Sequence, residues 1–171
     1  MHSRLLSTIL LSLLCSCSFF QSKVDFQTYT HPSIGFSIEY PKNWELQEGG
    51  ELGGQVSFLT KKTTSVFRAN ANIVVSKADI KNTEVLARLS TQQLKLILND
   101  YELITQNSTQ LGHLDGFELR GKYKAKEGMR TIRTIVAIKD DNEFVFTFTC
   151  PSDKENNYTQ IVNHMIQSFK S

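Results

Sequence analysis

The chain has 171 residues, of which 40% are hydrophobic and 21% are charged, and its formal net charge at pH 7 is +2. This length is enough for one domain with a sizeable core, and there is no internal repeat, low-complexity tract or second domain boundary. The nearly balanced charge excludes the strongly basic surface that drives binding to nucleic acid.

The first residues are typical of an export signal. A short basic start at residues 1–4 precedes residues 5–14, which are apolar apart from Ser7, Thr8 and Ser12. A membrane-spanning helix needs about 20 apolar residues, whereas the apolar part of a secretory signal needs about 7 to 15. We therefore expect residues 1–16 to be a signal peptide that is removed.

The next segment, Leu14-Cys15-Ser16-Cys17, resembles the lipobox of bacterial lipoproteins, in which an apolar residue and two small residues precede the acylated cysteine. Cys17 fits the acylated position better than Cys15, because cleavage before Cys15 would place the bulky Leu14 at the cut. Each acyl methylene that is buried adds about 0.8 kcal/mol of membrane affinity. A covalent lipid on Cys17 is thus the predicted anchor, and a plain secreted protein or an uncleaved anchor is the alternative.

The predicted mature chain has 155 residues (171 − 16) and a net charge of +1, because the signal carries away only Arg4 among its charged residues. Residues 17–28 are expected to be a lipidated tether, and residues 29–171 a single domain. Ser18 favours the outer membrane, because lipoproteins retained at the inner membrane tend to have aspartate in its place.

Strands are predicted by alternation and by β-branched residues. Phe36, Ile38 and Tyr40 alternate with polar residues and predict a strand that stops at Pro41, which has no amide hydrogen for the ladder. Further strands are predicted at residues 55–60 and 70–76.

A helix is predicted next, capped by Asn82 or Thr83 and continuing to Tyr101. Its apolar positions recur with the helical period and should form one buried side. These positions are Leu86, Leu89, Leu94, Ile97, Leu98 and Tyr101.

A strand at residues 103–111 and a three-stranded meander at residues 117–124, 129–138 and 143–150 are expected to follow. The predicted turns are Asp115-Gly116, residues 126–128 and residues 140–142. In the first meander strand Phe117, Leu119, Gly121 and Tyr123 should face inward, and the residues between them outward. Cys150, the single cysteine of the mature chain, is in phase with Phe144, Phe146 and Phe148 and should be a buried core residue.

The last helix is predicted from the capping-box spacing of Ser152 and Glu155 after Pro151. Its apolar face consists of Tyr158, Ile161, Val162, Met165, Ile166 and Phe169. Two amphipathic helices and six or seven mostly antiparallel strands predict an α+β fold, with an antiparallel sheet flanked by helices as an α/β/α sandwich.

The opening Tyr29-x-x-Pro32-x-x-Gly35-Phe36-x-Ile38-x-Tyr40-Pro41-x-x-Trp44 resembles that of the PsbP-like family, as do Asp115-Gly116, the strand 144–148 and Ile166-x-Ser168-Phe169. This family includes DcrB-like bacterial lipoproteins and cyanobacterial PsbP-like proteins. The resemblance covers residues 28–170 and implies the Mog1/PsbP-like fold without a shared catalytic set. Members in oxygenic phototrophs are extrinsic lumenal subunits of photosystem II that help to retain calcium and chloride.

Candidate chemistry is sparse. His31, His113 and His164 lack a supporting catalytic motif, so no enzyme is predicted. His113 and Asp115 are the candidate metal ligands, for calcium or zinc, although Asp115 is also explained by its turn. His31 is expected in a turn or at the surface, and His164 on the polar side of the last helix.

A basic surface is the other candidate site, and it could meet anionic head groups or an acidic protein. The alternative is an ordinary solvated strand face. Its residues are Arg120, Lys122, Lys124, Arg130 and Arg133, with Lys126 nearby.

The sequence thus predicts a membrane-anchored, non-enzymatic binding or scaffold module on the periplasmic face. Its expected partners are the membrane, through the lipid, and an envelope or membrane protein, but not nucleic acid, and the domain is expected to be monomeric. One alternative is an extrinsic or assembly subunit of photosystem II in the thylakoid lumen of a phototroph, with bound calcium. A metal-dependent enzyme is the third possibility.

Overall fold

The computed structural model of the protein describes residues 24–49, 55–63 and 67–171. The predicted signal peptide, Cys17 and the first part of the tether lie outside these residues. The described elements are β1 (Phe26–Thr30), β2 (Ser37–Pro41), β3 (Glu45–Glu48), β4 (Val56–Leu59), β5 (Asn70–Lys77), α1 (Thr83–Ile97), β6 (Glu102–Leu111), β7 (Leu114–Ala125), β8 (Gly128–Lys139), β9 (Asn142–Pro151), the 3-10 turn η1 (Ser152–Lys154) and α2 (Glu155–Ser168).

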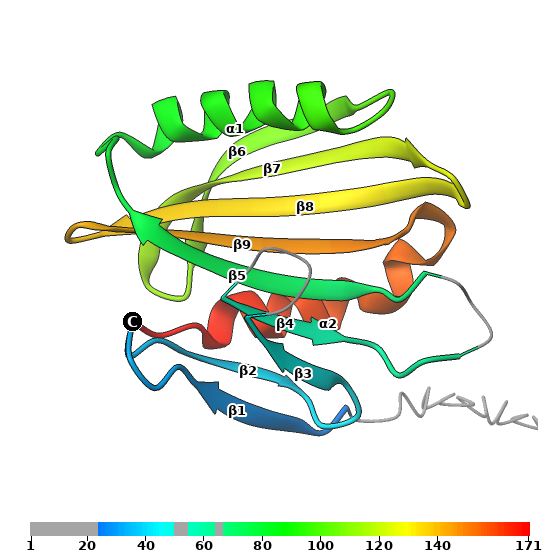
Figure 1. Ribbon diagram of the computed structural model, residues 1–171, viewed down its shortest axis with the longest axis horizontal. Helices are drawn as coiled ribbons and strands as arrows, with labels where there is room; N and C mark the ends of the chain where they lie inside the picture. The colour runs from blue at the N-terminus through cyan, green and yellow to red at the C-terminus, as the bar shows by residue number, and fades with distance from the viewer. Residues whose placement is uncertain (1–23, 50–54, 64–66) are drawn as a thin grey trace, which may run out of the picture.

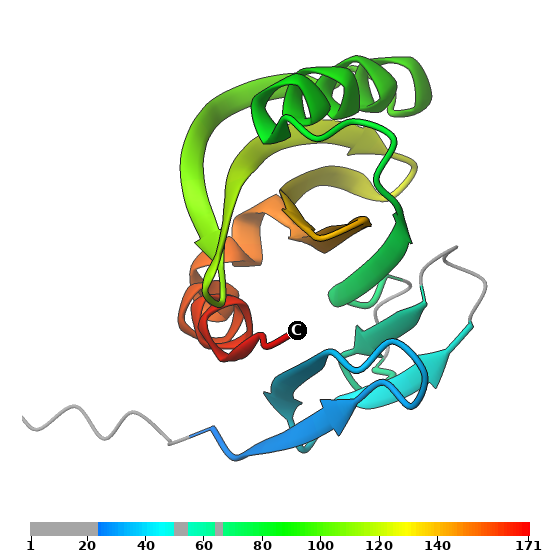
Figure 2. The same ribbon diagram turned by 90° about the vertical axis from the view of Figure 1, so that its left-hand side faces the viewer.

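Seven strands form one sheet in the order β3-β4-β5-β9-β8-β7-β6, and every neighbouring pair is antiparallel. Helix α1 covers one face of this sheet and α2 lies on the other (Figure 1). Figure 2 shows the same two helices from the side, with the small β1–β2 sheet next to α2. The predicted α+β fold, an antiparallel sheet flanked by helices, is confirmed.

Helix α1 begins as predicted and ends early. The Asn82 side-chain oxygen accepts hydrogen bonds from the backbone N–H groups of Glu84 and Val85, both at 3.0 Å, which satisfies two amides of the first turn. The helix ends at Ile97 rather than at Tyr101. Ile97 is 73% exposed, so the apolar side predicted for this helix is only partly buried.

The main core lies between the sheet, α2 and the β1–β2 hairpin. Val162, Met165 and Ile166 of α2 are buried there together with Phe36, which is fully inaccessible. Cys150 is also fully buried in this core, as its phase with the strand phenylalanines predicted. A smaller core beneath α1 consists of Leu86, Ala87, Leu119 and Val136.

The turn between β6 and β7 differs from the predicted one. The chain reverses at Gly112 and His113, since Leu111 pairs with Leu114, so the predicted Asp115-Gly116 turn is wrong. Gly112 has φ +61°, and an added Cβ would collide with the Phe169 carbonyl. A glycine is therefore needed at 112, both for its backbone conformation and for the close approach of the hairpin to the end of α2.

The folded domain begins earlier than the predicted boundary at residue 29, because it includes an N-terminal hairpin. Residues 26–28, assigned above to the tether, belong to β1 and pair with β2. The Phe26 ring stacks on the His164 ring of α2, with 3.8 Å between the two ring centres. The His164 Nε2 atom lies 2.6 Å from Glu39 Oε2. His164 therefore contacts the hairpin and is not simply on a polar surface.

Among the described residues, no helix is both long and apolar enough to cross a membrane.

Candidate functional site: a groove beside α2

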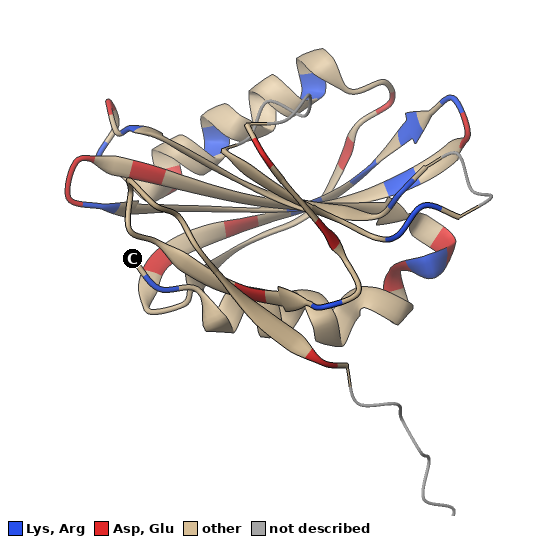
Figure 3. Ribbon diagram, turned by 60° about the horizontal axis from the view of Figure 1, so that its bottom comes forward, with Lys and Arg blue, Asp and Glu red and all other residues tan. Residues whose placement is uncertain are grey.

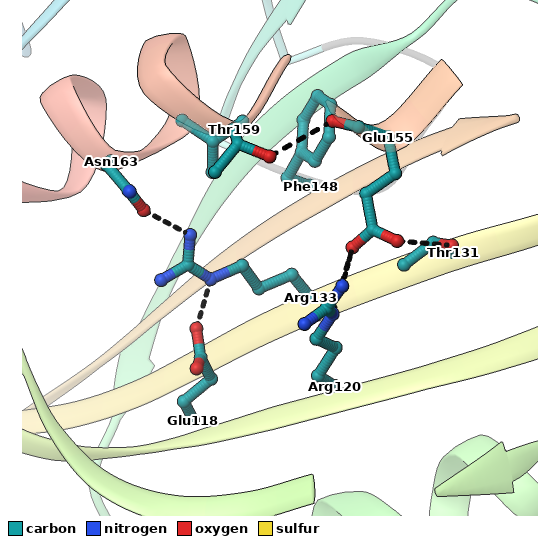
Figure 4. Close-up of a pocket in the computed structure, with 9 residues that line it drawn as sticks. Glu118, Arg120, Thr131, Arg133, Phe148, Glu155, Thr159 and Asn163 are labelled. Atoms are coloured by element: carbon teal, nitrogen blue, oxygen red, sulfur yellow. Dashed lines mark hydrogen bonds and ion pairs between the residues drawn. The ribbon is translucent and has the colours of Figure 1, made fainter. Parts of the chain in front are cut away.

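A half-buried pocket of about 230 Å³ lies between α2 and the central parts of β7 and β8 (Figure 4). Strand alternation places Glu118 and Arg120 on the same face of β7, and the ladder pairs Arg120 with Arg133 of β8. The pocket is lined by Glu118, Arg120, Thr131, Arg133, Phe148, Glu155, Thr159, Val162 and Asn163.

Glu155, the first residue of α2, links the helix to the sheet. One of its carboxylate oxygens accepts hydrogen bonds from Arg120 Nε at 2.9 Å and Nη2 at 2.6 Å. The other accepts a hydrogen bond from the Thr131 hydroxyl at 3.3 Å. The single Thr131 hydroxyl proton is shared between this oxygen and the Ser152 hydroxyl oxygen, which lies 3.1 Å away.

These contacts replace the predicted capping box. Neither η1 nor α2 has a side-chain hydrogen bond at its cap. Ser152 and Glu155 instead turn toward β8 and β7, because the partly buried Arg120 and Thr131 need partners there.

Arg133 is held in the same way on the other side of the pocket. Its Nε donates to a Glu118 carboxylate oxygen, and its Nη1 donates to the Asn163 side-chain oxygen at 2.6 Å. Two guanidinium groups and two carboxylates therefore face one another, and their formal charges cancel.

A second hollow, of about 400 Å³, adjoins this pocket and shares Arg133 and Asn163 with it. Its other lining residues include Gln110, Gly112 and Gln167. We call the two hollows together the α2 groove. Its walls carry amide, hydroxyl, guanidinium and carboxylate groups beside the apolar side chains of Phe148, Val162 and Ile166, which together suit a ligand with both polar and apolar parts.

The structure divides the predicted basic surface. The face of β7 that was expected to be outward is partly covered by α2, so Arg120 and Arg133 are paired with acids. Lys122 and Lys124 follow on the same face of β7. Arg130 lies on the opposite face of the sheet from Arg133, because the two are three positions apart on one strand, and it is buried. Figure 3 shows basic and acidic positions interspersed along the ribbon in this view.

The two candidate metal ligands lie at the end of the β6–β7 hairpin. His113 is in the turn and exposed, whereas exposed Asp115 accepts a hydrogen bond from the Gln110 amide at 3.0 Å. Within the described residues there is no group of three or more histidine, cysteine or acidic side chains placed to hold a metal ion. A metal at this pair stays a prediction.

His31 has the structural role expected for a turn residue. Its Nδ1 accepts hydrogen bonds from the backbone N–H groups of Ser33 and Ile34, at 3.2 and 3.1 Å. The ring therefore shapes the connection between β1 and β2.

Comparison with models of protein families identifies the family of this chain. The family model described as DcrB matches residues 38–168, which is most of the chain. The chain belongs to the DcrB family. A comparison with curated proteins found no match.

Solved structures similar to this DcrB family member share its fold at low sequence identity. LpqN, involved in cell envelope biogenesis of Mycobacterium tuberculosis, is 15% identical with a TM-score of 0.65, over 86% of this chain and 90% of LpqN. The cyanobacterial PsbP protein (CyanoP) of Synechocystis sp. PCC 6803 is 16% identical with a TM-score of 0.63, over 92% of this chain and 98% of CyanoP. The Ran-binding protein Mog1p of Saccharomyces cerevisiae is 11% identical with a TM-score of 0.61, over 86% of this chain and 96% of Mog1p. The resemblance to the PsbP-like family is thereby confirmed at the level of the fold.

Proposed function

We propose that this DcrB family member is a lipid-anchored, non-enzymatic binding module of the cell envelope, and that it engages a membrane or envelope partner through the α2 groove. The observation that carries the proposal is the groove itself. It is half-buried, it combines apolar side chains with charged groups that balance one another, and it belongs to a domain that follows the predicted lipobox at residues 14–17.

The length of the tether supports a partner at the membrane. Eight residues lie between the proposed lipidated Cys17 and Phe26, where β1 begins, so the two residues are nine Cα-to-Cα steps apart, which span at most about 30 Å when extended. A domain on so short a tether meets membrane proteins and their extramembrane parts at high effective concentration.

The charge pattern of the groove supports binding rather than acid–base chemistry. Glu118 and Glu155 are each engaged by a guanidinium, and Arg133 is also fixed by Asn163. Side chains held in this way offer oriented donors and acceptors to a ligand without rearrangement, which lowers the entropic cost of binding.

Metabolic labelling with palmitate tests the anchor. We expect label in the wild-type protein and in a Cys15→Ser variant, but not in a Cys17→Ser variant, which should also leave the membrane fraction. Equal labelling of the two cysteine variants, or unlabelled wild-type protein, would contradict the proposed acylation site.

Site-specific cross-linking in intact cells tests the groove. A photoreactive amino acid at Thr159, which lines the pocket, should give a discrete adduct with an envelope or membrane protein. The matched control is the same group at Gln92, an exposed position of α1 on the opposite side of the sheet. Adducts that are identical from both positions, or absent from Thr159, would count against the groove as the contact site.

The likeness to CyanoP favours one alternative, a lumenal role at photosystem II with bound calcium, if the host is a phototroph. This alternative requires that the host makes chlorophyll. It also requires that calorimetric titration of the protein with calcium gives a heat of binding. Failure of either requirement would reject it.

A further inference from the structure

Arg130 differs from the other arginines of the predicted basic surface in its burial. Its side chain is only 4% exposed, whereas that of Arg120 is 43% exposed. It lies at the start of β8, on the face of the sheet opposite the α2 groove, and its guanidinium carbon is 4.2 Å from the centre of the Phe67 ring.

The guanidinium of Arg130 is poorly matched by acceptors in the described part of the chain. Its Nε has no hydrogen-bond partner there. Its terminal nitrogens contact the Met129 carbonyl and the Glu127 carboxylate, both at 3.5 Å, which is the outer limit of a hydrogen bond. Arg120 and Arg133, by contrast, each have close acceptors on two nitrogens.

A buried guanidinium in this state is unfavourable by itself. It carries five N–H donors and a fixed charge, and burying a charge that is incompletely paired is costly. The contact with the Phe67 ring offsets only part of this cost. Glu127 contributes little, since its carboxylate oxygen is 3.5 Å from the Arg130 nitrogen and its side chain is 41% exposed to water.

The space in front of Arg130 can hold a ligand. An open hollow of about 590 Å³ is lined by Arg130, Met129, Ser152 and Lys154, together with Glu127 and Asp153. The Lys154 ammonium and the Ser152 hydroxyl are donors at the same hollow. Arg130 is its most deeply buried charged group.

We propose that this hollow is a second binding site, which takes the oxyanion group of a ligand and holds it on the guanidinium of Arg130. A planar fork of N–H donors matches a carboxylate or a phosphate oxyanion with two parallel hydrogen bonds. Such a ligand displaces the long contact with Glu127 and supplies acceptors that Arg130 does not have among the described residues. The Arg130 side chain lies on the other face of the sheet from Arg120 and Arg133 of the α2 groove.

Nitrogen-15 NMR of the arginine Nε–H groups tests the site on the purified protein in detergent. Inorganic phosphate and acetate are the two probes, each compared with sodium chloride at equal ionic strength. We expect a saturable shift of the Arg130 signal, which is identified by its absence from an Arg130→Met variant. The stronger response of the two probes tells whether phosphate or carboxylate is the preferred oxyanion.

The variants separate this site from general electrostatics. Arg130→Met keeps the aliphatic stem and should weaken the binding of the preferred probe at least about tenfold, since it removes the bidentate contact. Arg88→Met, which removes the same charge at an exposed position of α1 that does not line the hollow, should leave that affinity within about twofold, because residues without shared partners act independently. Two outcomes overturn the proposal: no saturable shift at Arg130 in the wild-type protein with either probe, or equal weakening by the two variants. If Arg130→Met does not fold, Arg130→Lys, which keeps the charge and lacks an arginine Nε–H group, identifies the Arg130 signal in its place.

Discussion

The Arg120–Glu155 ion pair should couple α2 to the sheet more strongly than an ordinary surface pair does. We would measure it with the variants Arg120→Met and Glu155→Gln and their combination. Exposed ion pairs contribute about 0.2 to 1 kcal/mol, whereas breaking a buried pair costs about 3 to 5 kcal/mol. Here Glu155 is 21% exposed and accepts two bonds from Arg120, at 2.9 and 2.6 Å, so we expect a coupling energy of about 1.5 kcal/mol, between these two ranges.

Urea denaturation of the four proteins, with linear extrapolation, gives this coupling energy as a double-mutant cycle. The control is the pair Lys81–Asp141, whose side chains are both largely exposed although their atoms approach to 2.5 Å. Added salt should weaken the control pair more than the partly buried pair. A coupling at Arg120–Glu155 that is no larger than in the control, or equally sensitive to salt, would refute our account of the groove.

Three further predictions concern the core and the turn. Phe36→Ala should destabilise the domain by about 3 to 5 kcal/mol in urea denaturation, because Phe36 is fully buried, while Leu96→Ala, at an 86% exposed position, should change stability by less than about 0.5 kcal/mol. Similar effects of both changes would contradict the described packing of the N-terminal hairpin. Gly112→Ala should cost more than about 1 kcal/mol by the same assay, because φ is +61° and the new Cβ meets the Phe169 carbonyl. Wild-type stability in that variant would contradict the tight docking of the turn. Burial raises the pKa of the Cys150 thiol to about 12, so iodoacetamide at pH 8 should label Cys150 only in urea. The folded pKa lies above the ordinary value of 9.0, so the stability from this group is full below pH 9 and is lost as the pH rises toward 12. A Cys150→Ala variant with the same loss of stability in that window would contradict this assignment.

Much of the fold could be predicted because periodicity reports burial directly. The alternation at residues 117–124 and the apolar stripe of the last helix gave the strand and helix correctly, since both have one buried face. Strands β1 and β3 were not predicted. All four residues of β3 are exposed and only Tyr29 of β1 is buried, so neither segment has a pattern to detect.

The errors arose where tertiary contacts outweigh local signals. Asp-Gly is a frequent turn sequence, but the packing of Gly112 against Phe169 fixes the turn three residues earlier. Ser152 and Glu155 have the spacing of a capping box, yet their side chains bind the sheet. Local sequence does not reveal which partner such a side chain will find.

The groove could be predicted only in part. Arg120 and Arg133 were identified as neighbours across a hairpin, which follows from strand pairing. Glu155, Thr159 and Asn163 were missed, because their placement depends on α2 crossing β7 and β8. No signal in a single sequence gives the position of a helix on a sheet.

The hydrogen bonds between Ser37 and Lys170, at 2.7 and 2.9 Å, join the beginning of the domain to its end. The hairpin near the N-terminus therefore has no place to dock until the segment around Lys170 has been synthesised. Closing so long a stretch of chain is slow compared with forming local turns. During biosynthesis the polypeptide should accordingly remain without its completed core until that late segment emerges. Such a delay fits the export that we propose, because a translocation channel for unfolded chains needs the domain to fold late.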